Sequence, residues 1–238
     1  MIRPRTAGFT LVELLISLAI LGVMLAALTS VEFSTIKGSS ELTVQADQVR
    51  ALQDLSGYLG DRLRAARDVS TSTTVNGVPC TLTPASGDTP CFALLVAEAR
   101  QQGTAVQYDP NTYLYLVYRL VPRSQLSMAD KTANSWADSN TFAVVESRFV
   151  VCQPDPSITT IPACSTPPTS LPTSFSTGAP NVLMDYATLD ATSGSLTPFA
   201  YDPSGQFTLL LRQKRLVRGS VKYTPSNAPL QLVVQRRN

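Results

Sequence analysis

A single acidic residue lies near the start of a long apolar run. Glu13 falls within residues 11–31, where every other residue is apolar or small. A carboxylate in such a segment is costly and usually functional, because its charge needs a compensating cation. A short basic leader with Arg3 and Arg5 precedes the run and ends in Gly8. These residues suggest a cleavage site before the apolar run and a cation that pairs with Glu13.

The order of these features separates the chain from an ordinary secretory precursor. In a secretory signal the apolar segment precedes the cleavage site and is removed. Here the expected cleavage site comes first, so the apolar segment stays with the mature protein. Its 21 residues span roughly 31 Å at about 1.5 Å per residue, enough to cross a bilayer core. The basic leader favours a cytoplasmic N-terminus, with the rest of the chain outside the cytoplasm. The alternative is a plain signal anchor in which Glu13 has no role.

Gly8 followed by Phe9-Thr10-Leu11-Val12-Glu13 resembles the processing site of type IV prepilins and type II secretion pseudopilins. The resemblance implies that residues 1–8 are a leader, that prepilin peptidase cleaves after Gly8, and that Phe9 is N-methylated. Glu13 would be the fifth mature residue, the acid that in this family pairs with a neighbouring subunit's N-terminal amine. The family also implies one span in the inner membrane and later assembly with other pilin or pseudopilin subunits into a cell-surface filament.

Three further stretches resemble the W-type minor pilin and the J-type minor pseudopilin. They are the helical run 48–64, the strand segment 118–120 and the late segment 199–205. In addition, Ser30 stands where major subunits commonly carry proline. This resemblance implies a low-copy subunit that primes or caps a filament near its tip. The alternatives are a tip binding module on the same scaffold, for adhesion or for DNA capture in transformation, and a type II secretion pseudopilin.

Four cysteines suit a chain exported to an oxidising compartment. Cys80 and Cys91 are eleven positions apart, and Cys152 and Cys164 are twelve apart. Each pair brackets a long loop, so local closure is the expected choice among the three possible pairings. Each bridge would add about 2–4 kcal/mol of stability.

The composition excludes several kinds of active site. The chain has no histidine, which removes Ser-His-Asp and Cys-His nucleophiles and histidine-bound metals. It also has no Walker motif and no Gly-rich dinucleotide motif. Asp185, Asp190 and Asp202 carry oxygens that suit calcium, but they lack the tight spacing of a calcium loop. We therefore expect no enzyme, no cofactor and no metal.

Positive charge is concentrated at the C-terminal end. Residues 70–202 hold five Lys/Arg and ten Asp/Glu, whereas residues 203–238 hold seven Lys/Arg and no acid. If the strands expected around 207–212 and 216–223 pair as a hairpin, alternation brings four cations into one patch. These four are Arg212, Lys214, Arg218 and Lys222. Such a patch is a solvated sheet face, a surface that docks on an acidic neighbouring subunit, or a contact with DNA phosphates.

A long helix is expected to carry the N-terminal residues. No proline occurs between Arg5 and Val78, which predicts a helix over about 10–69 that is roughly 90 Å long. Residues 9–34 form its membrane and assembly half, and residues 35–69 form an amphipathic half. Apolar residues at spacings of three and four make a stripe that we expect to lie on a globular domain. The stripe comprises Leu42, Ala46, Val49, Leu52, Leu55, Leu59, Leu63 and Ala66.

Residues 70–238 are expected to form one β-rich domain outside the cytoplasm. Turn residues separate short strand-like runs, which predicts a mostly antiparallel sheet. The strands are expected at 92–98, 113–120, 142–151, 181–187, 207–212, 216–223 and 230–234. Together with the helix this is an α+β fold. Three long polar loops, 70–91, 122–141 and 152–180, are either surface decoration or functional.

Overall fold

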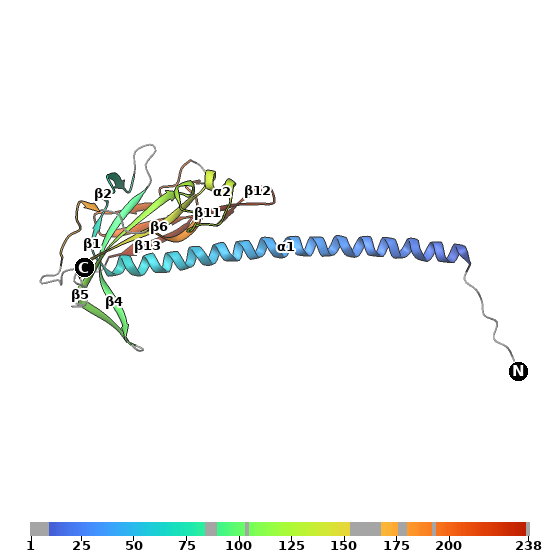
Figure 1. Cartoon of the computed structure of the whole chain (residues 1–238), viewed down its shortest axis with the longest axis horizontal. Coiled ribbons are helices and arrows are strands. Elements are labelled where there is room, and N and C mark those ends of the chain that lie inside the picture. Colours follow the sequence, from blue (N-terminus) through green and yellow to red (C-terminus); the bar gives the residue numbers. More distant parts are fainter. Residues whose placement is uncertain are drawn as a thin grey trace. The chain divides into compact units, whose positions relative to one another are not determined.

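The computed structural model describes residues 10–83, 90–102, 105–152, 168–175, 180–191 and 194–236. The chain divides into two compact units, Met1–Asp47 and Gln48–Asn238. The helix α1 (Leu11–Ala65) supplies all the secondary structure described in the first unit and the opening element of the second. Figure 1 shows the elements with their labels.

In the first unit, the described side chains of α1 from Thr10 to Ile36 are exposed on every face of the helix. Glu13 lies in the first turn of α1, and Arg62 and Arg64 lie in the last turn. This charge order suits the helix dipole at both ends. The helix ends at Ala65, four residues earlier than the sequence predicts. Residues 66–70 instead form a strand, because their pairing with a neighbouring strand overrides the local helical pattern.

In the second unit, α1 buries one apolar stripe. Leu52, Leu55, Leu59 and Leu63 are each at most 3% exposed. The predicted stripe begins too early, since Val49 is 43% exposed. Gln48 is buried in its place, and its Oε1 accepts a 2.8 Å hydrogen bond from the hydroxyl of Thr224.

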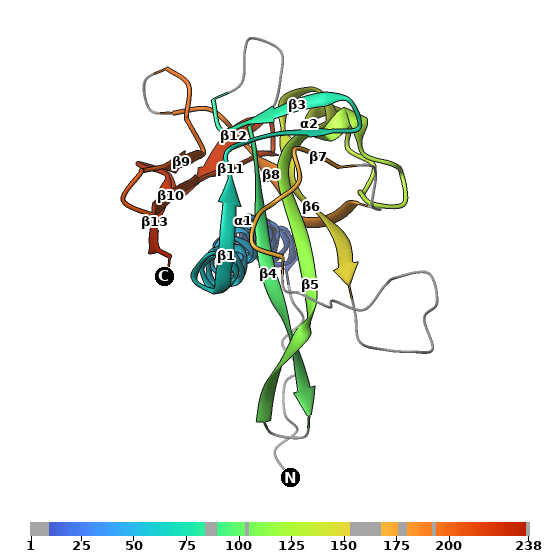
Figure 2. The ribbon, with the colours of Figure 1, turned by 90° about the vertical axis from the view of Figure 1, so that its left-hand side faces the viewer.

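A seven-stranded antiparallel sheet forms the centre of the second unit, in the order β1-β4-β5-β6-β8-β11-β12. Its strands are β1 (Ala66–Ser70), β4 (Cys91–Gln102), β5 (Ala105–Pro122), β6 (Phe142–Cys152), β8 (Pro180–Ala187), β11 (Gln213–Val217) and β12 (Ser220–Thr224). Figure 2 shows β4, β5 and β6 side by side, with the far ends of β4 and β5 extending beyond the other strands.

Two three-stranded sheets complete the second unit. One has the order β13-β10-β9, made of β13 (Leu230–Gln235), β10 (Gln206–Leu211) and β9 (Phe199–Tyr201). The other has the order β3-β2-β7, made of β3 (Val78–Thr81), β2 (Ser72–Val75) and β7 (Ser174–Phe175), with β2 and β7 parallel. Between β5 and β6 lie the short 3-10 helix η1 (Arg123–Gln125) and α2 (Ser135–Asn140).

The main core joins the leucine stripe of α1 to one face of the large sheet and to β10 and β13. Phe92 is its aromatic centre, with ring centroids 5.0 Å from Tyr118, 4.9 Å from Phe199 and 4.6 Å from Phe207. The α+β prediction is therefore confirmed: a long helix precedes an antiparallel sheet domain and buries part of its length there.

The predicted strand at 216–223 is wrong, because it is the tip of a hairpin. Arg218 and Gly219 have φ values of +53° and +78°, and they join β11 to β12 as a two-residue turn. Asn76 and Gly77, with φ of +53° and +79°, join β2 to β3 in the same way. Two positive φ values characterise the tight hairpin turn that matches strand twist. The predicted loop 70–91 therefore contains a hairpin.

Candidate assembly site

The processing residues lie outside the described residues. Gly8 and Phe9, and the basic leader before them, belong to residues 1–9, for which no structure is described. Cleavage after Gly8 and methylation of Phe9 therefore stay predictions. The description begins at Thr10, one residue before α1.

Glu13 and Thr10 close the N-terminus of α1 on itself. Oε2 of Glu13 accepts hydrogen bonds from the Thr10 amide (2.9 Å) and from the Thr10 hydroxyl (3.0 Å). The Glu13 amide in turn donates to Oγ1 of Thr10 at 3.3 Å. This reciprocal arrangement is a capping box, which satisfies backbone donors that the first turn of a helix leaves unpaired. In the single chain the carboxylate therefore binds its own helix start, and a pairing with a neighbouring subunit stays a prediction.

Three hydroxyl groups of α1 donate to carbonyls of its own backbone. Ser17 donates to the carbonyl of Glu13 at 2.8 Å, Thr29 to Ala26 at 3.0 Å, and Thr35 to Val31 at 2.9 Å. Such bonds satisfy these three donors when a helix faces hydrocarbon. By length and composition, α1 is the one described helix that qualifies to cross a membrane.

The first part of α1 exposes an unusually large apolar surface. Large apolar side chains on it are more than half exposed: Leu11, Val12, Leu14, Leu15, Ile16, Leu18, Ile20, Leu21, Val23, Met24, Leu25, Leu28, Val31, Phe33 and Ile36. Exposed apolar surface of this extent marks a contact with lipid or with other protein chains. The apolar segment with Glu13 at its start is therefore the candidate site for assembly.

One of the two expected cysteine pairs is described. Cys80 on β3 and Cys91 on β4 form a disulfide, with a Cα–Cα distance of 5.0 Å. Both cysteines are at most 2% exposed and belong to a small apolar cluster with Val117 and Phe175. The second expected pair, Cys152 and Cys164, lies outside the described residues: only the backbone of Cys152 is described.

The basic patch expected from the sequence does not form, because two of its four cations are used inside the fold. Arg212 is 4% exposed and donates to the carbonyls of Pro225 (3.1 Å), Ser226 (2.5 Å) and Asp190 (3.3 Å). Lys214 forms an ion pair of 2.7 Å with the carboxylate of Asp190. Arg212 therefore fixes the turn at Pro225 and Ser226.

The hairpin register separates the other two cations. Lys222 lies directly opposite Arg215, whereas Lys214 lies opposite Tyr223. Opposed residues of an antiparallel pair share a face, so Lys222 and Lys214 lie on opposite faces of the hairpin. Arg218 occupies the turn. The prediction failed because it placed residues 216–223 on one strand and paired that strand with residues 207–212.

A buried cluster of charged residues around Arg123 was not predicted from the sequence. This side chain is fully buried and forms an ion pair of 2.9 Å with Asp185 and a second one with Asp138. Its guanidinium also donates to the carbonyl of Thr132 at 2.6 Å. Although burial opposes the charged form, the hydrogen bonds and charge of Asp185 raise the pKa of Arg123. The cluster ties the predicted loop 122–141 to the sheet, and a lone arginine after an aromatic strand gives no signal for it.

A second missed cluster joins α1 to the sheet. Glu146 on β6 is fully buried, and it accepts hydrogen bonds from Tyr58 on α1 and Arg148 on β6, both at 2.6 Å. The hydrogen bond to Glu146 raises the pKa of Arg148. Tyr118 lies opposite Glu146 in the sheet, and burial followed by the charge of Glu146 raises the pKa of its hydroxyl well above the usual value. The cluster thus stabilises the docked helix.

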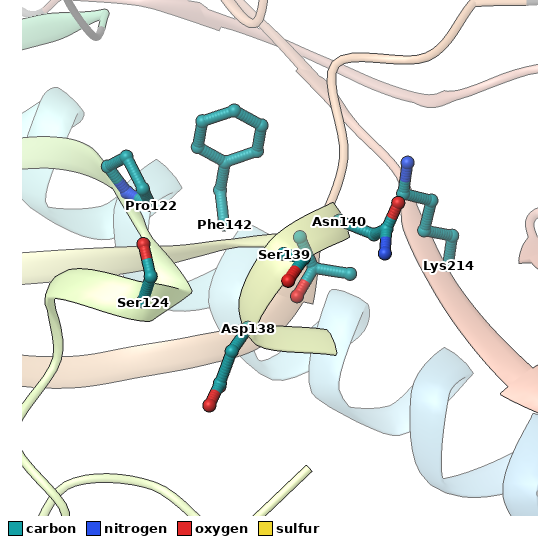
Figure 3. Close-up of a pocket in the computed structure, with 8 residues that line it drawn as sticks. Pro122, Ser124, Asp138, Ser139, Asn140, Phe142 and Lys214 are labelled. Carbon is teal, nitrogen blue, oxygen red and sulfur yellow. The ribbon is translucent and has the colours of Figure 1, made fainter. Parts of the chain in front are cut away.

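A cleft of about 450 Å³ lies beside α2, and Lys214 of β11 also lines it. Figure 3 shows its lining residues. Asp138 and Lys214 supply its charges, and each is already paired, with Arg123 and Asp190 respectively. Asp185 and Asp190 bind different cations, and among the described residues no group of three or more acids or cysteines could hold a metal ion. The cleft therefore presents no unpaired charge.

The comparison with known protein families matches the N-terminal segment. Residues 3–29 match the family described as the prokaryotic N-terminal methylation motif. No curated protein and no solved structure matches the chain. The matched segment contains Gly8, Phe9 and Glu13 and residues 11–29 of α1. The chain thus carries a prepilin-type methylation motif, which supports its place among type IV pilin-like proteins.

Proposed function

We propose that this protein is a minor pilin or pseudopilin that primes or caps a type IV pilus-like filament. One observation carries the proposal: the described part of the matched segment, residues 10–29, is exposed throughout and from Leu11 forms an apolar helix with an acid in its first turn. An exposed helix of this kind needs lipid or other helices around it. Prepilin peptidase and other pilin subunits are the partners that the motif implies.

The proposed location follows from the same segment. The protein is held in the inner membrane by the apolar part of α1, with the sheet domain outside the cytoplasm. The disulfide between Cys80 and Cys91 supports an oxidising environment for this domain. The protein then leaves the membrane when its helix packs into the filament.

Glu13 is proposed to exchange partners during assembly. Before assembly its carboxylate caps its own helix through Thr10. In the filament the positive N-terminal amine of a neighbour would replace that contact. An ion pair between the carboxylate and a positive amine in an apolar bundle is stronger than a capping bond from neutral donors. A buried carboxylate that lacks its cation destabilises the assembly by several kcal/mol.

The test compares two acids on the same helix in cells that form filaments. Glu13→Gln should leave the protein in the membrane and processed normally, but reduce its amount in sheared filaments about tenfold or more. Glu32→Gln, another exposed acid of α1, is the matched control and should enter filaments normally. Equal incorporation of the two variants would contradict the assembly role of Glu13.

A second experiment identifies the filament system to which the protein belongs and its role there. Deleting the gene of a priming subunit should lower the number of filaments per cell, whereas deleting a tip binding module should leave the number unchanged and reduce adhesion or DNA uptake. Loss of protein secretion without loss of pili would instead identify a type II secretion pseudopilin. We favour the priming role, because the cations expected to contact DNA are separated or paired in the fold.

A further inference from the structure

The face of the large sheet that points away from α1 is covered in two separate pieces. Along β5, Tyr118 and Leu120 face the main core with α1, whereas Val117 and Val121 face the other side. One piece of the cover is the β3-β2-β7 sheet, which packs on Val117. The other is the segment after β5, where Leu126 packs on Val121 and Val145.

Arg119 lies between these two covering segments, the β3-β2-β7 sheet and the segment after β5. Alternation along β5 puts it on the same face as Val117 and Val121, between the two apolar clusters. A cleft of about 440 Å³ lies between the two segments, and Arg119 lines it. Val78 of β3 lines it from one cover and Leu126 from the other, with Val121 and Val145 of the sheet between them. Besides Arg119 and these apolar side chains, the polar residues Gln125, Ser127 and Asp130 line the cleft.

Arg119 has no partner within the described part of the chain. Its Nε is buried without a hydrogen-bond acceptor, and the guanidinium makes no ion pair with any described residue. Burial lowers the pKa of Arg119, as expected for a charge that lacks compensation. Asp130 also lines the cleft, but its carboxylate accepts a 2.6 Å hydrogen bond from Ser127. Arg123 and Arg212 are more deeply buried than Arg119, and their guanidinium groups are fully hydrogen-bonded.

Both walls of the cleft are fixed from outside it. Cys91, which lies opposite Arg119 in the sheet, is joined by the disulfide to Cys80 on β3. On the other side, Arg123 holds the segment after β5 through Asp138 and Asp185. A cleft whose walls are held by a disulfide and buried ion pairs needs little reorganisation when a ligand enters, which favours binding.

We propose that this cleft binds a carboxylate carried beside an apolar group, with Arg119 as its cation. The planar guanidinium matches a carboxylate in shape and carries the opposite charge. Asp130, which lines the same cleft, repels a phosphate dianion more strongly than a carboxylate with its single charge. The apolar lining selects ligands with an aliphatic neighbour. The carboxylate belongs either to an acidic side chain of a peptide or to a small free carboxylic acid. This proposal does not depend on the proposed role in a filament.

The test titrates the full-length protein in detergent micelles with defined probes. One probe is the capped peptide acetyl-Leu-Glu-Leu-amide, with acetyl-Leu-Gln-Leu-amide as its neutral counterpart. The other is 4-methylpentanoate, a small apolar monocarboxylate. The side-chain Nε–H resonance of Arg119, assigned by its loss in Arg119→Gln, reports the contact. Calorimetry gives the affinity.

The control variant is Arg215→Gln. Arg215 also has a buried Nε without an acceptor, but it stacks 4.1 Å from the centre of the Tyr186 ring and does not line the cleft. We expect saturable binding of a carboxylate probe to the wild type and to Arg215→Gln, and at least a tenfold loss in Arg119→Gln. The glutamine peptide should bind at least tenfold more weakly than the glutamate peptide.

The results separate the two sources of the carboxylate. Tighter binding of the glutamate peptide indicates a polypeptide ligand, and tighter binding of 4-methylpentanoate indicates a free acid. Arg119→Gln should also keep the unfolding midpoint of the wild type or raise it, because it removes an uncompensated buried charge. Absence of saturable binding of both carboxylates to the wild type, or equal binding by Arg119→Gln, would overturn the proposal.

Discussion

The hydroxyl of Tyr58 on α1 donates a 2.6 Å hydrogen bond to the buried carboxylate of Glu146 on β6, 88 residues away in sequence. Arg148 holds the other carboxylate oxygen at 2.6 Å and also donates to the Tyr58 hydroxyl at 3.1 Å. Helix and sheet are thus joined by a polar contact at the border of an apolar interface. The contact fixes the rotation of α1 about its own axis, because a leucine stripe alone tolerates small shifts.

The first prediction concerns this contact. Tyr58→Phe removes one donor from a buried carboxylate and should lower the free energy of unfolding by about 1–3 kcal/mol. Denaturant unfolding of the full-length protein in detergent, followed by circular dichroism, measures the change. Tyr201→Phe is the matched control, because the Tyr201 hydroxyl has no hydrogen-bond partner among the described residues, and it should stay within about 0.5 kcal/mol of wild type. Equal effects of the two variants would mean that the Tyr58 contact adds no stability.

The second prediction concerns pH. Partial burial acts to raise the pKa of Asp190, but Lys214, Tyr223 and Thr188 outweigh it and lower that pKa below 3.8. The unfolded chain therefore binds the proton at Asp190 more readily than the folded chain does. The stability that ionised Asp190 gives to the fold is complete above the pKa of the unfolded chain and is lost as pH falls through the pKa of the folded chain. Between about pH 5 and pH 2, the thermal midpoint should fall more steeply for wild type than for Asp190→Asn.

The control for this pH series is Asp54→Asn, which changes a surface carboxylate whose side chain is 76% exposed. It should follow the wild-type profile. If Asp190→Asn also follows that profile, the pair with Lys214 makes no difference to acid stability.

The third prediction concerns Arg123. Arg123→Leu removes the cation that pairs with Asp185 and leaves Asp138 with Lys131 alone, so it should cost about 3–5 kcal/mol, as expected for breaking a buried pair. Trp136, the single tryptophan of the chain, lies in α2 within the segment that Arg123 holds. Its fluorescence should therefore report release of this segment at lower denaturant than global unfolding. Arg64→Leu, which removes a surface ion pair with Asp61, should leave the Trp136 transition unchanged. An unchanged transition in Arg123→Leu would argue against the anchoring role.

The fourth prediction concerns the cysteines. Replacing Cys80 and Cys91 together by alanine should lower the free energy of unfolding by about 2–4 kcal/mol, because the disulfide restricts the unfolded chain. Peptide mapping without reductant should find this bridge and a second one between Cys152 and Cys164, with no free thiol. A Cys80–Cys164 crosslink would contradict local closure.

The sequence predicts elements well where one physical signal dominates. The apolar run with no proline specifies a helix, and alternating or continuous apolar runs specify β4, β5, β6, β8, β10 and β13. The boundaries depend on tertiary contacts instead. Residues 66–70 join the sheet because β4 offers a free edge, and Val49 is left exposed because no described element covers it.

The polar residues were harder to predict for a related reason. The basic-patch prediction places Arg212 and Lys214 on the surface, since most arginines and lysines are solvated. Arg123, Arg212 and Lys214 instead satisfy carbonyls and carboxylates created by loops whose paths are unknown before folding. Asn76-Gly77 is a dipeptide typical of a two-residue hairpin turn, so this hairpin can be predicted from the sequence. Arg218-Gly219 was not readable, because arginine is uncommon at a positive φ.

The disulfide between Cys80 and Cys91 has a consequence for proteolysis. The two cysteines are 11 positions apart and join β3 to β4. A protease that cuts the backbone once between them therefore leaves the N-terminal fragment, with α1, covalently attached to the fragment that carries β4 and all later strands. The nicked protein would migrate as one band on a gel without reductant and as two bands with it. A single cut there does not release the sheet domain from its helix.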